Sequence, residues 1–297
     1  MIVTGLGQCS WDYLAVVDSF PQVDTKKEVH QWDEQGGGPV ATALVTLSRL
    51  GIKCRFHGVT GDDREGEEIR QSLIDENIDA RGIMKRANAS SQIAFIVIEK
   101  NTGKRTIFWK RPAGAELKIK ELESNFLKNS RFLLIDGLMK DISLYAAKKA
   151  QRLKIPVMLD AGKMRNGMLE IAKNCDYVAA SEEFAKELGW KNNPDAFLKK
   201  IKHLKFKIFT ATLGEKGSYT FSQDQYFYTP AFKVKAVDTT GTGDVFHGGY
   251  VFGILKGWEI RDTVRFASAI AAMKCRKIGG RAGIPKLNEV LKFMGKK

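Results

Sequence analysis

Short apolar segments alternate with helix-like segments along the second half of the chain, and this alternation constrains the fold more than any other feature. The runs "RFLLIDG" (131–137), "PVMLDAG" (156–162), "DYVAAS" (176–181) and "KIFTATLG" (207–214) are typical of buried strands, and helix-like segments separate them. Strands that alternate with helices at this spacing form parallel sheets. We therefore expect an α/β fold, a doubly wound, mainly parallel sheet with helices on both faces.

The N-terminal third contains further buried strands and, in addition, two β-rich segments outside the main sheet. "MIVTGLG" and "KCRFHGVTG" (53–61) resemble further buried strands, and "GGGPVATALVTLSRLG" (36–51) indicates a glycine turn that leads into a helix. Two β-rich segments, near 12–35 and 90–112, depart from the alternation. We expect them to form a small antiparallel lid on a single domain that spans residues 1–297.

Several protein classes are disfavoured. No apolar run reaches the roughly 18 to 20 residues that span a bilayer, and the N-terminus has no basic segment before its apolar stretch. We therefore expect a cytoplasmic protein without a membrane partner. The four cysteines lie far apart in the sequence and form no CxxC pair, so we expect free thiols, neither a zinc site nor a disulfide framework.

The chain is basic, with 48 Lys and Arg against 34 Asp and Glu and a net charge of +14. The basic residues are spread along the chain with acidic residues nearby, so no single patch for nucleic acid stands out. We expect no nucleic-acid partner. A preference for small anionic ligands accounts better for this charge.

The stretch "DTTGTGD" (238–244) precedes the helix-length apolar segment "VFHGGYVFGIL". Glycines before a helix let backbone amides converge on one point, and with the helix N-terminus they form an anion site. Asp244 at this turn has two interpretations. It caps the helix, or it takes a proton from a hydroxyl beside the bound anion, which is the pairing that phosphoryl transfer needs.

A second glycine turn, "TLGEKGS" (212–218), follows a strand directly. It is compatible with a phosphate or nucleotide contact and equally with a plain β-turn. His247 lies one helical turn after Asp244, where it either packs in the core or adjusts the properties of the carboxylate.

Taken together, these stretches resemble the ribokinase (PfkB) family of carbohydrate kinases. "DTTGTGDVFHGG" is similar to the C-terminal signature of the family, "GGGPVATALVTLSRLG" to its N-terminal signature and "TLGEKG" to its nucleotide loop, and "GDDREG" and "GGRAGIP" also fit. The motifs follow the family order and span nearly the whole chain. The closest motif likeness is to sulfofructose kinase-like and ketohexokinase-like members.

The resemblance implies a ribokinase-like fold and a set of site residues. Asp244 would be the catalytic base, and Gly241, Thr242 and Gly243 would supply the anion-hole amides. The ATP side would comprise Thr212, Gly214, Gly217, Ala267 and Ala271, and the sugar side Asp12, Gly37, Gly38 and Thr42. Asp238 and Thr240 would bind a monovalent cation such as K⁺.

Two departures from the family pattern matter. Thr42 stands where members usually carry asparagine, and "SEEF" (181–184) lacks both the asparagine and the glutamate of the family's N-x-x-E magnesium motif. Glu182 or Glu183 could substitute for that glutamate. Three arginines are candidates for an anionic substrate: Arg105 and Arg111 in the lid segment, and Arg165 after a strand of the main sheet.

The resemblance implies an enzyme that transfers the γ-phosphoryl group of ATP, with Mg²⁺, to a hydroxyl of a small sugar. A ketohexose or a related, anionic sugar is the expected acceptor. A nucleoside kinase of the same fold and a catalytically silent sugar- or nucleotide-binding regulator are the alternatives. If the lid is apolar on its outer side, it would pair two subunits as a homodimer.

Overall fold

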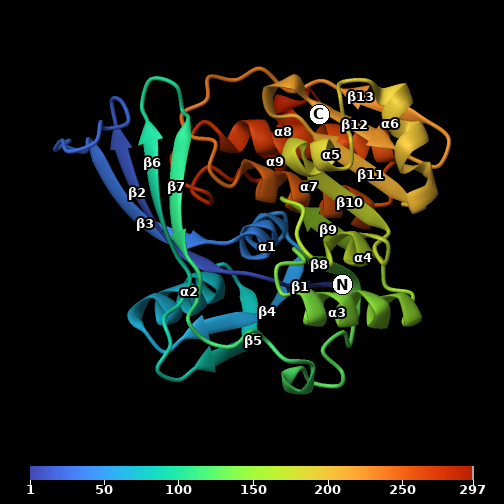
Figure 1. Ribbon diagram of the computed structural model, residues 1–297, viewed down its shortest axis with the longest axis horizontal. Coiled ribbons are helices and arrows are strands. Elements are labelled where there is room, and N and C mark those ends of the chain that lie inside the picture. The colour runs from blue at the N-terminus through green and yellow to red at the C-terminus, as the bar shows by residue number, and fades with distance from the viewer. Residues whose placement is uncertain (296–297) are drawn as a thin grey trace.

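Two β-sheets of unequal size organise the protein (Figure 1). The computed structural model describes residues 1–295. In this part of the chain the larger sheet has nine strands, in the order β13-β12-β11-β10-β9-β8-β1-β4-β5. They are β1 (Ile2–Leu6), β4 (Lys53–Gly61), β5 (Ile78–Arg86), β8 (Ser130–Ile135), β9 (Val157–Ala161), β10 (Tyr177–Ser181), β11 (Ile208–Thr212), β12 (Ser218–Phe221) and β13 (Tyr226–Thr229). Pairing is parallel from β5 to β11 and antiparallel beyond, as the sequence pattern predicts.

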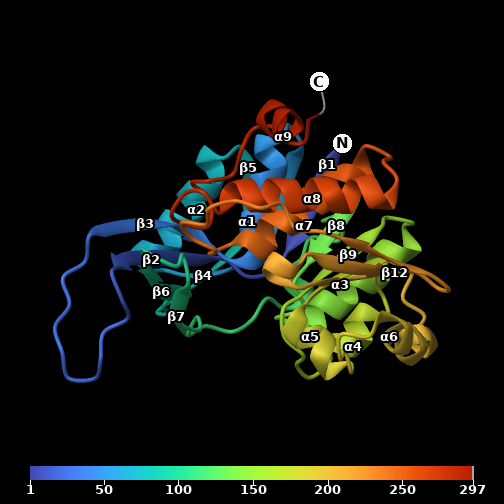
Figure 2. The ribbon, with the colours of Figure 1, turned by 90° about the horizontal axis from the view of Figure 1, so that it is seen from above.

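Helices cover both faces of this sheet, and Figure 2 shows the two layers. One layer packs on a core cluster that includes Val40, Leu44, Phe252 and Phe266. The other packs on a cluster that includes Ile142, Phe184 and Phe197. The first layer holds α1 (Pro39–Arg49), α2 (Arg64–Asp75), α7 (Thr242–Leu255), α8 (Ile260–Lys274) and α9 (Leu287–Phe293), and the second α3 (Lys140–Arg152), α4 (Met168–Ala172), α5 (Glu182–Glu187) and α6 (Pro194–Ile201).

The smaller sheet is the expected lid. Its strands β3 (Gln31–Gly37), β2 (Ser10–Val17), β6 (Ile93–Glu99) and β7 (Arg105–Lys110) lie side by side in that order. The prediction of a purely antiparallel lid is wrong, because the central pair β2–β6 is parallel. Both strands enter the lid after parallel strands of the large sheet, β1 and β5, and therefore leave the same edge in the same direction.

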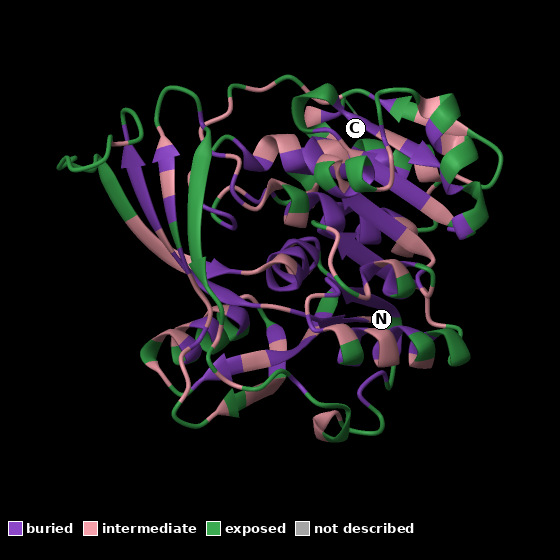
Figure 3. Ribbon diagram, viewed as in Figure 1, coloured by how far each residue is buried: buried purple, intermediate pink, exposed green. Residues whose placement is uncertain are grey.

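The two faces of the lid differ. Leu14, Ile96 and Ile98 on one face are buried and pack with Ile278, so this face points toward the rest of the chain. Side chains alternate between faces along a strand, so Tyr13, Phe95 and Phe108, which are paired across β2, β6 and β7, lie on the outer face. Figure 3 shows that β7 is exposed along its length.

One strand of the large sheet was not anticipated. β5, "IDARGIMKR", lies at the sheet edge and pairs with β4 alone in the sheet order. Its charged residues interrupt the apolar pattern that marks the buried strands. Within residues 1–295, no helix is long and apolar enough to cross a membrane.

Candidate active site

The N-terminus of α7 begins at a position, residue 241, whose backbone conformation and close packing favour glycine. Gly241 is the N-cap residue, with φ of 69°, and a Cβ at this position would lie 2.8 Å from the Cα of Gly280. By helix geometry the amides of the first turn, including those of Gly243 and Asp244, have no partner within the helix. At position 243 a Cβ would meet open space, so this turn faces outward from the core.

Asp244 does not cap the helix. It is the third residue of α7, after Thr242 and Gly243, and no side chain caps the helix start. The carboxylate therefore remains available beside the first-turn amides. The capping interpretation is therefore not supported, and the role of Asp244 as a base stays a prediction.

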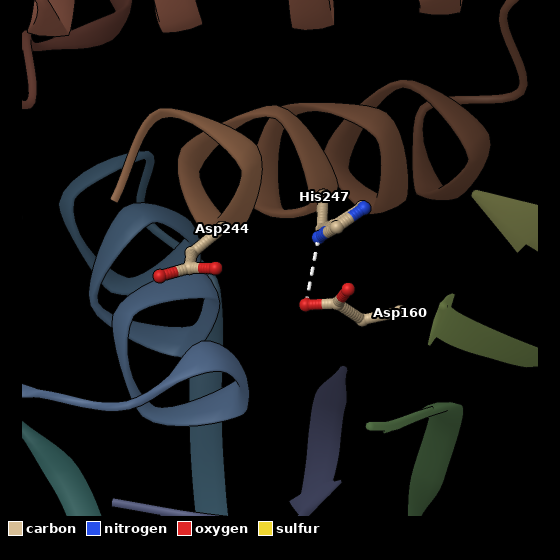
Figure 4. Close-up of side chains that lie close together, drawn as sticks. All are labelled: Asp160, Asp244 and His247. Carbon is tan, nitrogen blue, oxygen red and sulfur yellow. Dashed lines mark ion pairs between the residues drawn. The ribbon is translucent and has the colours of Figure 1, made fainter. Parts of the chain in front are cut away.

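Asp244 belongs to a cluster with Asp160 and His247 (Figure 4). Asp160 lies near the end of β9, and its Oδ2 is 3.0 Å from Nδ1 of His247, with both side chains almost fully buried. The ligand atoms of the three side chains lie within 4.8 Å of one another. The cluster thus brings together one helix and the carboxyl edge of the sheet.

The charges in this cluster depend on one another. Burial raises the pKa of Asp244 to about 7, and the negative charge of Asp160 adds to the rise. His247 and Arg105 oppose it. Burial disfavours the charged form of His247, but Asp160 and Asp244 outweigh burial and raise its pKa. Within the cluster, His247 is paired with Asp160 alone, and Asp244 lies beside this pair.

The residues predicted to contact ATP include some at an open turn after β11 and others that are closely packed against neighbouring elements. Thr212 lies at the end of β11, and Gly214 opens a short 3₁₀ turn at φ of 60° with open space around a Cβ. Gly217 is constrained by the close approach of Thr229 O, so it also serves the β12–β13 hairpin. Ala267 has no exposed surface and packs against Gly249 of α7, and its contact with adenine stays a prediction. Ala271, in the same helix, is also buried.

The predicted sugar side centres on Asp12. This buried carboxylate accepts a hydrogen bond from Ser10 Oγ at 2.7 Å and packs on the backbone of Gly37, where a Cβ would clash with it. Burial raises the pKa of Asp12 to about 6, against the influence of Ser10 and Arg281. Gly38, with φ of 93°, begins α1 against the backbone of Cys9.

Thr42 is less accessible than the sequence prediction requires. It is 1 % exposed, and its Oγ1 lies 3.5 Å from Nε of Arg281. The guanidinium of Arg281 also donates to Gly37 O at 3.0 Å and to Ser72 Oγ at 3.1 Å. Arg281 thus connects Thr42 to the Gly37 turn, and the sugar contact of Thr42 stays a prediction.

A small cavity of about 110 Å³ lies at the carboxyl end of β1, with Gly7, Gln8 and Arg111 among its lining residues. Directly beside it, the carboxylate of Asp136 accepts from Gln8 N at 2.7 Å and from Leu138 N at 3.0 Å. Burial raises the pKa of Asp136 to about 7. Arg111, whose guanidinium lies 5.0 Å from the ring centroid of Trp109, is an exposed side chain at the edge of this cavity.

The other basic candidates lie apart from one another. Arg105 in the lid donates from Nη1 to Thr239 Oγ1 at 2.8 Å, so the lid contacts the loop before α7. Arg165 lies in the loop between β9 and α4, which is distant in the sequence from both Arg105 and Thr239. Glu183, a candidate for the magnesium role, is paired at 2.9 Å with Lys163, and Glu182 is paired at 2.9 Å with Lys186.

The predicted cation residues Asp238 and Thr240 are buried next to each other. Asp238 Oδ1 accepts from Thr240 N at 2.8 Å and from Thr240 Oγ1 at 2.7 Å. The fully buried Lys274 reaches the same loop, with Nζ 3.1 Å from Asp238 O. This lysine adds a positive charge that sequence reasoning did not anticipate.

A mainly parallel α/β sheet with helices on both faces and a second, small sheet define an α/β protein of the ribokinase fold, which solved structures share. A putative ribokinase from Agrobacterium tumefaciens has a similar structure, with a TM-score of 0.91 and 25 % identity, covering 99 % of this chain and 97 % of that chain. Residues 3–287 match the pfkB family of carbohydrate kinases, and the chain belongs to this family.

Curated relatives span the same length. A nucleoside kinase from Methanothermobacter thermautotrophicus is 24 % identical over 97 % of this chain and 93 % of its own. Fructokinase-1 from Zea mays is 27 % identical over 88 % of both chains. The protein is accordingly a phosphotransferase, a sugar or nucleoside kinase of this family.

Four residues of the site were missed at the sequence level: Asp136, Asp160, Lys274 and Arg281. The two aspartates follow a usable signal, since each stands at the end of a buried strand ("LLID" and "VMLD") whose carboxyl edge carries sites in such sheets. Lys274 and Arg281 carry no such signal. Their partners lie in segments distant in the sequence.

Proposed function

We propose that the protein transfers the γ-phosphoryl group of ATP to a hydroxyl of a small sugar, a ketohexose or a close relative. The observation that carries this proposal is that the carboxylate of Asp244 lies beside the first-turn amides of α7 without capping the helix. Asp244 takes the proton of the acceptor hydroxyl, the acceptor oxygen bonds to the γ-phosphorus, and the bond from that phosphorus to the ADP oxygen breaks.

The loop before α7 stabilises the transferring group. The first-turn amide of Gly243 faces the negative charge of the phosphoryl oxygens, and the positive helix end adds to the attraction. The amide of Thr242 donates to Thr239 O at 3.4 Å within the loop. Mg²⁺ enters with ATP as part of the substrate, where it neutralises phosphate charge. The positive charge of Arg105, held on the loop by Thr239, would lie near the same group.

The two carboxylates near the sheet edge have different tasks in this proposal. Asp244 acts on the acceptor, whereas Asp160 holds the imidazole ring of His247, with Oδ2 at 3.0 Å from Nδ1. His247 is a positioning residue, because its charge favours the ionised form of Asp244 in a buried setting.

The acceptor class is drawn from relatives and from charge. The likeness to a fructokinase supports a ketohexose, and Asp12 beside the Gly37 turn supplies a carboxylate for sugar hydroxyls. Arg105 and Arg111 favour an anionic variant of such a sugar. The nucleoside kinase among the relatives makes a nucleoside the second candidate.

We also propose a homodimer that forms through the outer face of the lid. Phe95 is 46 % exposed, and its ring stacks on Tyr13 at 5.1 Å, while Phe108 is 53 % exposed. Trp32, also half exposed, lies beside Tyr13. An aromatic patch of this kind is typical of an interaction surface.

The function is tested with Asp244→Asn and a panel of acceptors: ketohexoses, aldoses, sulfonated sugars and nucleosides, each with Mg·ATP. Turnover on the best acceptor should fall by about 10³-fold or more, because the variant lacks the base. Thermal stabilisation by the acceptor and by a non-hydrolysable ATP analogue should persist. Asp141→Asn, an exposed carboxylate in the first turn of α3, is the matched control and should retain full turnover.

Three outcomes count against parts of the proposal. Near-normal turnover of Asp244→Asn removes the base assignment. Turnover of nucleosides alone by the wild type replaces the sugar with the second candidate. Binding of sugar and ATP without any turnover would identify the silent regulator.

A further inference from the structure

The loop that leads into α7 is held by a lysine with no exposed surface. Lys274, the last residue of α8, is 0 % exposed, and so is Asp238. Its Nζ donates to the backbone carbonyl of Asp238 at 3.1 Å and lies 3.8 Å from Oδ2 of the same residue. Lysine is almost never fully buried unless it is paired, so this ammonium has a defined partner in the loop.

Asp238 connects the segments that shape the anion site. Oδ1 accepts from both the amide and the hydroxyl of Thr240, and Oδ2 accepts from Gly279 N at 2.7 Å. Gly279 precedes Gly280, whose backbone packs against Gly241, the N-cap residue of α7. The position of the first-turn amides therefore depends on the Asp238 carboxylate remaining in place between Thr240 and Gly279.

These contacts test whether a separate K⁺ fits here. A bound cation needs carbonyl and carboxylate oxygens that face an open site. The carbonyl of Asp238 already faces the ammonium of Lys274, and its two carboxylate oxygens accept from Thr240 and Gly279. A K⁺ on the same oxygens would lie beside a like charge in a buried setting, which is unfavourable. The residues therefore do not fit the cation that the sequence resemblance implies.

We infer that the ammonium of Lys274 replaces the monovalent cation at Asp238, so that the kinase needs no K⁺ to order the loop before α7. The covalently attached charge offsets Asp238 and fixes the loop at all salt compositions. The inference rests on the proposed function only for the role of this loop in catalysis.

The first experiment uses the wild-type protein in tetramethylammonium chloride and in KCl at equal ionic strength. We expect the melting temperature to agree within about 1 °C, because a ligand that does not bind cannot stabilise the fold. Thallium-205 NMR should show no saturable bound Tl⁺, and turnover on the best acceptor should agree within about 1.5-fold. A saturable rise of the melting temperature with K⁺, together with bound Tl⁺, overturns the inference.

The second experiment removes the charge. Lys274→Ala should lower the melting temperature and reduce turnover by about tenfold or more in tetramethylammonium chloride, because Asp238 loses its counter-charge and the loop shifts. K⁺, NH₄⁺ or methylammonium should restore part of both losses by entering the vacated space. Lys274→Met fills that space without a charge and should not be restored. Lys277→Met, an exposed lysine three residues along, should behave as wild type.

The cation-binding measurements and the turnover measurements distinguish a failure of the cation inference from a failure of the proposed kinase function. The melting and thallium measurements need no acceptor, so they decide the cation question even if no sugar or nucleoside is turned over. Should Lys274→Ala fail to fold in tetramethylammonium chloride and fold in KCl, the inference is supported. If Lys274→Ala keeps wild-type stability and turnover without K⁺, the ammonium is not the required cation.

Discussion

The start of α7 and the lid sheet differ in how their residues are held. Around α7 the backbone itself is constrained: a Cβ on Gly248 would lie 2.6 Å from Thr46 Cβ in α1, and one on Gly249 would lie 2.6 Å from Ile270 Cγ2 in α8. In the lid, by contrast, Ile107 and Phe108 are adjacent residues on an exposed strand, 41 % and 53 % exposed.

Under the proposed function, this difference assigns the chemical step to the start of α7 and the choice of acceptor and partner subunit to the lid. The proposed function requires amides that converge on a phosphoryl group, which needs a fixed backbone, and the close packing of Gly241, Gly248 and Gly249 constrains the backbone of α7. A surface that chooses an acceptor or a partner subunit works through exposed side chains, which tolerate change. Substitutions at α7 should therefore affect turnover, and substitutions in the lid should affect affinity and assembly.

After the loss expected for Asp244→Asn, the next largest effect on turnover is expected for Gly241→Ala. A positive φ with alanine costs about 1–2 kcal/mol, and the added Cβ also clashes with Gly280, which displaces the first-turn amides. The turnover number should fall by about 10²-fold. Steady-state kinetics and chemical denaturation measure the two effects.

Gly257→Ala is the matched control. Gly257 has nearly the same φ, 70°, but open space around its Cβ. It should lose similar backbone stability and keep its turnover. Equal loss of turnover in both variants would show that general destabilisation, and not the clash at the anion site, limits catalysis.

A smaller effect, a shift of the pH profile, is expected within the cluster of Asp160, Asp244 and His247. Asp244 must be ionised to act as a base, and its pKa is raised to about 7, so kcat/KM should rise with pH through about 7 and then level off. Asp160→Asn removes a negative neighbour and should move this rise to lower pH by about half a unit or more. His247→Gln removes a positive neighbour and should move it to higher pH.

Opposite shifts are the diagnostic feature. A variant that only disturbs the geometry of the site lowers the limiting kcat/KM at high pH. It does not shift the apparent pKa of the profile in the direction that the removed charge predicts. Shifts of the same sign in the two variants would contradict the proposed coupling. Solvent viscosity controls ensure that the profile reports the chemical step.

The same contrast explains what could be predicted from the sequence. The alternation after residue 130 was sufficient to predict strands β8 to β11, and the glycine turn was sufficient to predict that Asp244 lies at the start of a helix, because local pattern determines both. β5 was missed because an edge strand need not be uniformly apolar. Lys274 and Arg281 were missed because their burial depends on contacts with Asp238 and Thr42 across the chain, which no local pattern encodes.

The smallest effect on turnover is expected from Phe108→Lys, on the outer face of the lid. A charge in the proposed apolar interface should convert dimers to monomers while changing the turnover number by no more than about threefold, since the residue faces away from Asp12. Sedimentation velocity at micromolar concentration measures the assembly. Ile107→Lys, its neighbour on the inner face, should leave assembly intact and raise KM for the acceptor. If both variants dissociate, or neither does, the two faces of the lid do not divide selection from assembly in this way.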